Sequence, residues 1–390
     1  MAKKRRVAVA INLGYPFTHH FDVFAGIERY SQEHGTWECV VDPFVQLVRQ
    51  NSGGTNFDGV VARASGELAR QAARVGVPVV NVWSGSPAKT LPTVLADYGA
   101  NAEMAAAHLL LRGYRRFAFQ GFVRHGGTRE ALAGYKAALR TAKCPWTTLL
   151  VSPKHDEGAR GWHKYMGQLQ QWIATWKPPL GVLSVQDHLS RYLASVCLRV
   201  GLRIPEDVAL IGLGNEHLVC THPEPSLSSI DMALDRVGYE AAALLDRLME
   251  GEPSPESFIR IPAKELVIRR STNTYLVENP LVRQALTFIA EHSHEGIRVD
   301  DVAKHVCAAV RSLERHFSAS LGRTMTEEIA RLRLERATRL LVESDESIKL
   351  VARACGYSDA NYFHQVFFKV HGVPPREYRR NHRSGSRSMK

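Results

Sequence analysis

The sequence predicts an α/β domain built from two lobes, followed by a smaller domain that is entirely helical. Three observations lead to this fold class. Over the first 275 residues short apolar runs alternate with helical stretches, these units form two series at about 5–110 and 115–230, and beyond Pro280 nearly every segment is helical. A chain of 390 residues is long enough for two or three domains.

The short apolar runs are typical of strands buried on both faces, as in a parallel sheet covered by helices. We expect such strands at 5–13, 58–63, 77–82, 115–122, 180–185 and 208–213, and a final strand at 258–269. We expect helices between them at 21–35, 65–75, 98–112, 129–140, 160–176 and 188–200. Sheets of this kind bind ligands at the carboxyl ends of their strands, so we expect a ligand cleft between the two lobes.

Composition also places the domain boundaries. Residues 250–280 are rich in Pro, Ser and Glu, which is typical of a connecting segment. We therefore predict a first domain at 1–275, a linker at 276–280, a helical domain at 281–380 and a basic tail at 381–390.

Several classes of protein are excluded by composition. No stretch approaches the ~18 continuous apolar residues of a membrane helix, and the basic N-terminus lacks the long apolar run and cleavage site of a signal peptide. The six cysteines have no paired spacing, and His19-His20 and His292-x-His294 lack the i, i+4 spacing of a zinc-binding helix face. We expect a cytoplasmic protein that uses no metal and does not bind a membrane.

The motifs of common enzymes are missing from the sequence. No GxGxxG opens a helix, "GLGNE" (212–216) is only a turn at the end of a strand, and "GVVARASGE" (59–67) is not a serine-nucleophile elbow. We find no set of catalytic residues and no cofactor loop, so we expect a protein that is not an enzyme and has no cofactor.

The charge is distributed unevenly along the chain. The formal net charge is +11, and residues 280–390 carry +6 of it. Residues 376–390 contain six Lys or Arg against the single acid Glu377. A basic run attached to a compact helical domain favours a polyanion as partner.

The helical domain contains the same pattern twice. In "SIKLVARACGYSDANYFHQVFFKV" (347–370) a helix ends at Gly356, Ser358 or Asp359 can cap the next helix, and an apolar stripe is predicted from Tyr362, Phe363, Val366, Phe367 and Val370. In "VDDVAKHVCAAVRSLERHFSASLG" (299–322) a turn at 307–309 precedes a second such stripe. Each pattern is typical of a helix-turn-helix, and the helix at 326–345 joins them.

Two such units followed by "HGVPPREYR" (371–379) resemble the AraC-type DNA-binding domain over residues 281–380. The resemblance implies two recognition helices in successive major grooves of double-stranded operator DNA. The residues on the outer faces of these helices are the predicted DNA contacts, namely Arg311, Ser312, Glu314, Arg315, Ala360, Asn361, His364, Gln365 and Lys369. Three positions depart from the family pattern: Cys307 replaces a turn Gly, Ala309 a capping Ser, and Gln365 a common Arg.

The first domain resembles the effector domain of LacI-type repressors, which has a periplasmic-binding-protein-like fold. The resemblance is carried by segments 96–121, 201–216 and 228–252. A LacI-type sensor domain fused to a C-terminal AraC-type domain is similar to the XylR-type regulators. The resemblance implies a sugar effector, held by the predicted contacts Arg129, Asp187, His20, Trp83 and Asn215, with His19 as a further candidate.

The effector itself stays open at this point. Ala131 and Gly214 stand where the family often has Arg and Asp, so two groups that would bind a polyol are missing. We expect a homodimeric, ligand-responsive regulator of genes for xylose or a related pentose, for which RNA polymerase is a further partner. The alternatives are the same architecture with a non-pentose effector or none, and a plain solute-binding protein.

Overall fold

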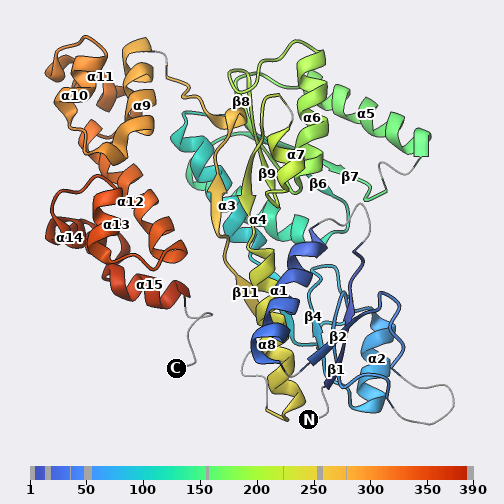
Figure 1. Ribbon diagram of the computed structural model, residues 1–390. Helices are drawn as coiled ribbons and strands as arrows, with labels where there is room; N and C mark the ends of the chain where they lie inside the picture. The colour runs from blue at the N-terminus through green and yellow to red at the C-terminus, as the bar shows by residue number, and fades with distance from the viewer. Residues whose placement is uncertain are drawn as a thin grey trace. The chain divides into compact units, whose positions relative to one another are not determined.

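The computed structural model describes residues 5–13, 19–35, 37–47, 55–154, 158–222, 224–252, 258–277 and 279–383. The chain divides into two compact units, residues 1–273 and 274–390 (Figure 1). Most of the predicted basic tail, from residue 384 onward, lies outside the described residues. No helix in the described part of the chain is long and apolar enough to cross a membrane.

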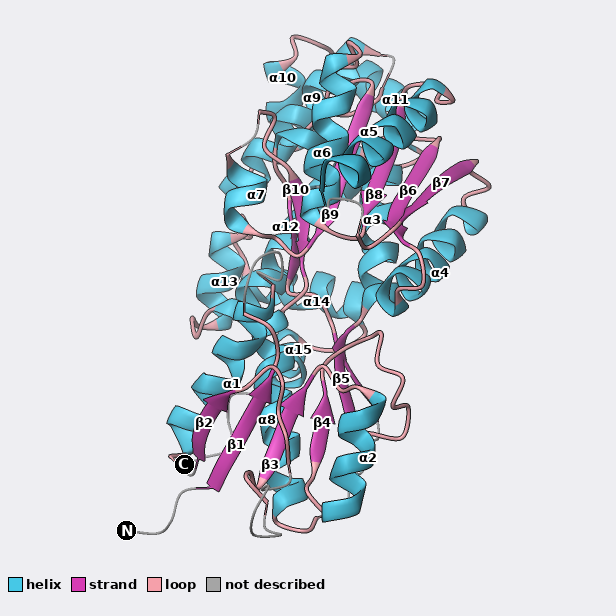
Figure 2. Ribbon diagram, turned by 90° about the vertical axis from the view of Figure 1, so that its right-hand side faces the viewer, coloured by secondary structure: helices cyan, strands magenta, loops and turns pink. Residues whose placement is uncertain are grey.

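The first lobe of the first unit is a parallel sheet whose described strands follow the order β11-β5-β4-β3-β1-β2 (Figure 2). Its strands are β1 Arg5–Ala10, β2 Trp37–Val41, β3 Gly59–Ala62, β4 Val79–Asn81, β5 Thr93–Ala96 and β11 Phe258–Ile261. Helices α1 His20–His34, α2 Gly66–Val75 and α8 Leu234–Met249 belong to this lobe. The central strands are fully buried, which confirms the expectation drawn from their continuous apolar sequence.

The second lobe has a sheet of the same size with the described order β12-β10-β9-β8-β6-β7. Its strands are β6 Phe117–Phe122, β7 Trp146–Val151, β8 Leu180–Ser184, β9 Val208–Leu213, β10 Ser228–Asp231 and β12 Glu265–Val267, of which only β12 is antiparallel. Its helices are α3 Tyr98–Leu111, α4 Gly126–Thr141, α5 Gly158–Ala174, α6 Asp187–Arg199 and α7 His217–Thr221. The predicted two-lobed α/β fold is therefore confirmed.

The chain passes between the two sheets at three places in the described residues. It leaves β5 for α3, returns from β10 to α8, and leaves β11 for β12. Two hydrogen bonds fasten these passages to one another: Asp97 N donates to Ile261 O at 2.9 Å, and Lys264 N donates to Asp231 O at 2.8 Å. The two lobes are thus joined by neighbouring backbone segments, as a hinge requires.

One sequence prediction is wrong, and several strands were missed. The single strand expected at 258–269 is two strands, β11 and β12, which lie in different sheets. Pro262 directly follows β11 and has no N–H to continue a ladder. Strands β2 and β7 escaped prediction because they are half-exposed edge strands, and β10 because two of its four residues are serines. Strand β5 was also missed, although all four of its residues are buried.

The second unit is entirely helical. Its elements are α9 Pro280–His292, α10 Val299–His305, α11 Val310–Leu321, α12 Met325–Glu343, α13 Ile348–Ala354, α14 Ala360–His371 and α15 Pro375–Arg383, with a short 3-10 turn, η2, at Ser293–Glu295. The described residues form one core around Leu286, Leu313 and Phe317, and another around Leu341, Phe363 and Phe367. Helix α12 contributes to both cores.

Tyr275 and Val277, which precede the first helix of this unit, are buried in the core around Leu286. We therefore predict that a fragment of residues 274–390 is more stable than one of residues 279–390. Both retain Asn279, whose side chain caps α9, so the comparison tests the segment that carries the two apolar side chains and the Val277 carbonyl, which accepts a hydrogen bond from Arg283. Deleting large buried side chains costs about 3 kcal/mol or more. Urea unfolding followed by circular dichroism measures the difference, and equal midpoints would show that these residues are not part of this core.

Candidate functional site

Polar and aromatic side chains gather where the strands of the first unit end. His19 and His20 follow β1, Arg63 follows β3 and Trp83 follows β4. The His19 and His20 rings are 4.4 Å apart, and the Arg63 guanidinium lies 4.8 Å from the centre of the Trp83 ring. His125, which follows β6 of the second lobe, is near enough to influence the charge of His19. The cluster therefore receives residues from both lobes.

The histidines of this cluster are kept neutral. Burial, together with the neighbouring His20, lowers the pKa of His19 to about 3. Burial lowers the pKa of His20 to about 4, and the Nδ1 atom of this ring is 2.7 Å from Asn12 O. Burial also lowers the pKa of His125. A neutral imidazole carries one donor and one acceptor, and in His20 and His125 the Nδ1 atom is already engaged by Asn12 O and Thr128 N.

Asp187, at the start of α6, is fully buried. Its carboxylate accepts hydrogen bonds from Ser229 Oγ at 2.5 Å and from Glu216 N at 2.9 Å. Burial raises the pKa of Asp187 to about 6, although these hydrogen bonds oppose the shift. The carboxylate thus joins α6 to β10 and to the segment after β9. This is a structural role, and direct contact with an effector stays a prediction.

The segment after β9 depends on that carboxylate. Gly214 has φ +129°, and a Cβ atom there would lie 3.2 Å from Asp187 Oδ2. An Asp at position 214 would bring a second carboxylate close to the first. Asn215 is held on both sides, since its Nδ2 donates to Asp231 and its Oδ1 accepts from Arg269. These contacts give Asn215 a structural role like that of Asp187.

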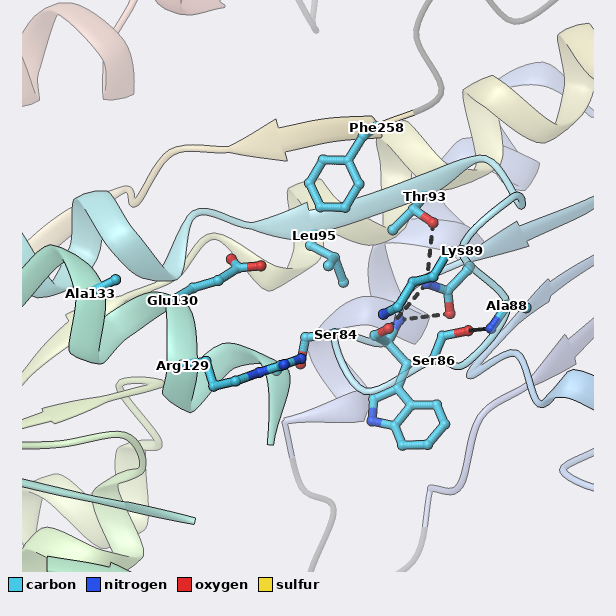
Figure 3. Close-up of a pocket in the computed structure, with 13 residues that line it drawn as sticks. Ser84, Ser86, Ala88, Lys89, Thr93, Leu95, Arg129, Glu130, Ala133 and Phe258 are labelled. Carbon is cyan, nitrogen blue, oxygen red and sulfur yellow. Dashed lines mark hydrogen bonds between the residues drawn. The ribbon is translucent and has the colours of Figure 1, made fainter. Parts of the chain in front are cut away.

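A cavity of about 400 Å³ lies between the lobes of the first unit. Its first-lobe lining includes Trp83, Lys89 and Phe258, and α4 of the second lobe contributes Arg129 and Glu130 (Figure 3). The lobes touch beside it, where Gly127 N donates to Ser84 Oγ at 3.2 Å. A cavity of this size is typical of small-molecule sites.

The predicted effector residues are thus distributed over two places. Trp83 and Arg129 line the cavity, and His20 lies in the adjoining strand-end cluster with Arg63. Asp187 and Asn215 follow β8 and β9 of the second lobe, and Glu216, whose N–H donates to Asp187, is near enough to His19 to influence its charge. The sequence analysis missed four residues of the cavity and the cluster beside it. Lys89 and Phe258 line the cavity, and Arg63 and His125 belong to the strand-end cluster. Arg63 and His125 follow strands, and that position was the available signal.

In the first helix-turn-helix, α10–α11, Arg311 and Arg315 are exposed on α11. Ser312 is half-buried. The prediction that Glu314 faces outward needs correction, because its carboxylate accepts a hydrogen bond from Met325 N at 3.2 Å. Glu314 therefore holds the start of α12, whose first backbone N–H groups have no partner within the helix.

In the second helix-turn-helix, α13–α14, Asp359 caps α14 as expected. The exposed face of α14 carries Asn361, Gln365 and Lys369, whereas His364 is half-buried and Ala360 packs against the core. The predicted apolar stripe is partly wrong, since Tyr362 is 58% exposed and Val370 61% exposed. Phe363 and Phe367 do fill the core as predicted, and Val366 packs against it, whereas Phe368, which was not part of the prediction, is 52% exposed.

Helix α12 fixes the two helix-turn-helix units relative to one another. Its residue Glu328 is fully buried and accepts hydrogen bonds from Arg323 at 2.6 Å and from Arg331 at 2.9 Å. Burial alone would raise the pKa of Glu328, but these two guanidinium groups outweigh it and hold the pKa below its usual value. Arg333 donates to the carbonyls of Ser293 and Ile297, both at 2.7 Å.

The departures from the family pattern are visible in the backbone of the first turn. Cys307 has φ +53°, a conformation that favours glycine. Ala309, at the N-cap of α11, provides no side-chain hydrogen bond. In the second helix-turn-helix the corresponding turn residue is Gly356, with φ +81°.

Comparisons with known proteins agree with this architecture. A periplasmic binding protein-like domain matches residues 106–272, and a helix-turn-helix domain matches residues 302–381. The xylose operon regulatory protein of Escherichia coli (strain K12) is 30% identical over 383 residues, which are 97% of each chain. The corresponding protein of Haemophilus influenzae is 29% identical over 290 residues, covering 74% of this chain and 75% of that one.

Solved structures give the same picture. The structure of the xylose-binding transcription activator xylR is 29% identical and superposes with a TM-score of 0.59, covering 97% of this chain and 98% of that chain. A complex of the transcriptional regulator CelR with cellobiose is 22% identical, has a TM-score of 0.55 and covers 70% of this chain and 86% of that chain. The second likeness shows the fold of the first unit alone.

The strained turn makes a stability prediction. Cys307→Gly should stabilise residues 274–390 by about 1 kcal/mol, because glycine adopts a positive φ without a Cβ clash. Gly356→Ala should do the opposite, since its Cβ would lie 2.8 Å from Ser293 O. Urea unfolding of both variants measures the two effects. A Cys307→Gly variant less stable than the parent would mean that the thiol contributes packing that outweighs the strain.

The raised pKa of Asp187 leads to a second prediction, which concerns how the free energy of unfolding of the first unit changes with pH. Below about pH 4 this carboxyl is protonated in both the folded and the unfolded state. As the pH rises from about 4 to 6 the unfolded state ionises first, so this group lowers the free energy of unfolding by about 3 kcal/mol. Asp187→Asn should remove that fall.

The measurement is urea unfolding at pH 4.5 and 6.5, followed by tryptophan fluorescence. All six tryptophans lie in the first unit, so the signal reports on that unit alone. The same loss of stability between the two pH values in Asp187→Asn and in the parent would contradict the assignment.

Proposed function

This chain belongs to the family of XylR-type transcription regulators, and on that premise we propose that an effector bound between the lobes of its first unit controls how its second unit engages operator DNA. It is a DNA-binding regulator and not an enzyme. The observation that carries the proposal is the pair of helix-turn-helix units joined by α12.

The geometry of that pair supports two neighbouring contacts with DNA. Helix α12 contributes to the cores of both helix-turn-helix motifs, so α11 and α14 are held at a fixed separation. Recognition helices held in this way reach major grooves about one helical turn apart, roughly 10 bp. Each chain would then occupy two adjacent boxes of an operator, and a homodimer would occupy four.

Individual contacts follow from the exposed side chains. Arg311 and Arg315 are one turn apart on α11 and are suited to guanine, because a guanidinium donates two hydrogen bonds to O6 and N7. Asn361 on α14 is suited to adenine in the same way. Lys369, near the end of α14, is suited to a phosphate.

The proposed effector is a sugar or a sugar derivative. The neutral imidazoles and the Trp83 ring support this class, since hydroxyl groups need paired donors and acceptors and sugar C–H faces pack on aromatic rings. Two relatives are named for xylose, which makes a pentose the first candidate. Ala131 and Gly214 provide no side-chain polar group, and this favours a second candidate, an effector other than a pentose.

The coupling between the units has a thermodynamic requirement. An effector changes DNA binding only to the extent that it binds the DNA-competent arrangement more tightly than the other. In our proposal a cytoplasmic homodimer provides the two arrangements, and RNA polymerase is the further partner that the bound regulator would contact.

We predict different consequences for two exposed cations of the second unit. Arg315→Ala should weaken binding to selected operator DNA by about 1–3 kcal/mol and relax the base preference in one box. Lys369→Ala should weaken operator and scrambled DNA alike and lower the salt slope by about one unit. Arg140→Ala, at the exposed end of α4 in the first unit, is the control.

The operator is obtained by selecting random duplexes with the full chain, and affinities are then measured at several salt concentrations. If no variant differs from the control, the second unit does not bind DNA through α11 and α14. If Arg315→Ala weakens both DNAs equally and leaves the base preference intact, Arg315 binds phosphate.

A further inference from the structure

The cavity between the lobes contains an excess of positive charge. Lys89 and Arg129 extend into it from opposite sides (Figure 3). Neither side chain forms an ion pair with another described residue. The carboxylate in the lining, Glu130, is already paired with Arg260 at 2.7 Å. Both cations are exposed, and among the described lining residues no carboxylate is left to pair with them.

The position of Arg129 is itself unfavourable for the helix. It lies near the start of α4, a helix of 16 residues whose first turn contains no acid. The N-terminal end of a helix carries a partial positive charge, so a cation near it is disfavoured. Residues that go against a local preference are expected at functional or strained sites.

The remaining lining can hold the body of a sugar. Phe258 and Trp83 provide aromatic rings, on which Arg260 and Arg63 already pack from one side, and Ser84 provides a hydroxyl group. The cavity is thus apolar on two sides, hydroxylated at the edge and cationic at its two ends. A neutral sugar would offer these two exposed side chains no charged partner.

We propose that this cavity binds an anionic sugar derivative, in which a carboxylate or a phosphate is attached to a polyol. The inference rests on the proposed function and narrows its effector class. A carboxylate or phosphate accepts two parallel hydrogen bonds from the guanidinium of Arg129, and Lys89 adds a point charge. An effector of this class also accounts for Ala131 and Gly214, because its affinity would come from the charged group rather than from the missing polyol contacts.

The test is calorimetric titration of the full chain with ligands that differ in one group. Glucose, glucuronate and glucose 6-phosphate share a ring and differ at C6, while xylose represents the pentoses. We expect glucuronate or glucose 6-phosphate to bind at least about tenfold more tightly than glucose and xylose, since hydrogen bonds to charged groups are the strong ones. The tighter of the two identifies carboxylate or phosphate as the anion.

Variants locate the binding. Arg129→Gln and Lys89→Gln should each weaken the anionic ligand about tenfold and leave neutral sugars unaffected, whereas Arg140→Gln, on the same helix, should change neither. Circular dichroism checks that each variant is folded.

Three outcomes would overturn the inference. If neutral sugars bind and the anionic ones do not, the inference fails while the proposed sugar-responsive function stands. If no ligand of the set binds, both fail. If the anionic ligand binds but Arg129→Gln and Lys89→Gln behave like the control, the anion lies elsewhere.

Discussion

The first unit depends on the three passages of the chain between its two sheets. Because β5 leads into α3, β10 into α8 and β11 into β12, each lobe is completed by segments that the other lobe delivers. The hydrogen bonds from Asp97 N to Ile261 O and from Lys264 N to Asp231 O tie these passages together. The lobes can therefore move only about this narrow set of residues. A ligand that bridges the two lobes would therefore change the angle between them about these connecting segments.

Each of the two units contains a fully buried carboxylate, and the two lie in opposite electrostatic surroundings. Glu328 lies between two guanidinium groups and has a lowered pKa, so it remains charged over a wide range of pH. Asp187 is held by hydroxyl and backbone donors, and its pKa is raised to about 6. In the helical unit the buried carboxylate is paired with arginines. At the strand ends of the second lobe, the buried carboxyl of Asp187 has a pKa close to neutral pH.

The two units also differ in how they meet their ligands. The exposed cations of α11 lie on a surface that the core around α12 holds rigid, as recognition of a regular duplex requires. The cavity, by contrast, takes its lining from both lobes, so its shape changes whenever the lobes move. One surface is fixed and the other is adjustable, and this division is what a ligand-responsive regulator needs.

Apolar periodicity in the sequence was sufficient for the fold class. Continuous apolar runs gave the buried strands β1, β3, β4, β6, β8 and β9, and the repeated helix-turn-helix pattern gave the fold of the second unit. Apolar periodicity did not predict β10, because two of its buried residues are serines. Their hydroxyl groups form hydrogen bonds with residues distant in sequence, among them Asp187, Arg269 and Thr272.

The roles of individual polar residues were decided by the tertiary structure. The sequence placed Asp187 after a strand and Glu314 on an outer helix face, and both turned out to anchor neighbouring backbone. It gave no reason to bring Lys89 and Arg129 to one cavity, since they lie on different lobes. Local pattern determines which face of an element is apolar. Which polar groups share a space depends on segments distant in sequence, and only the packed chain brings those together.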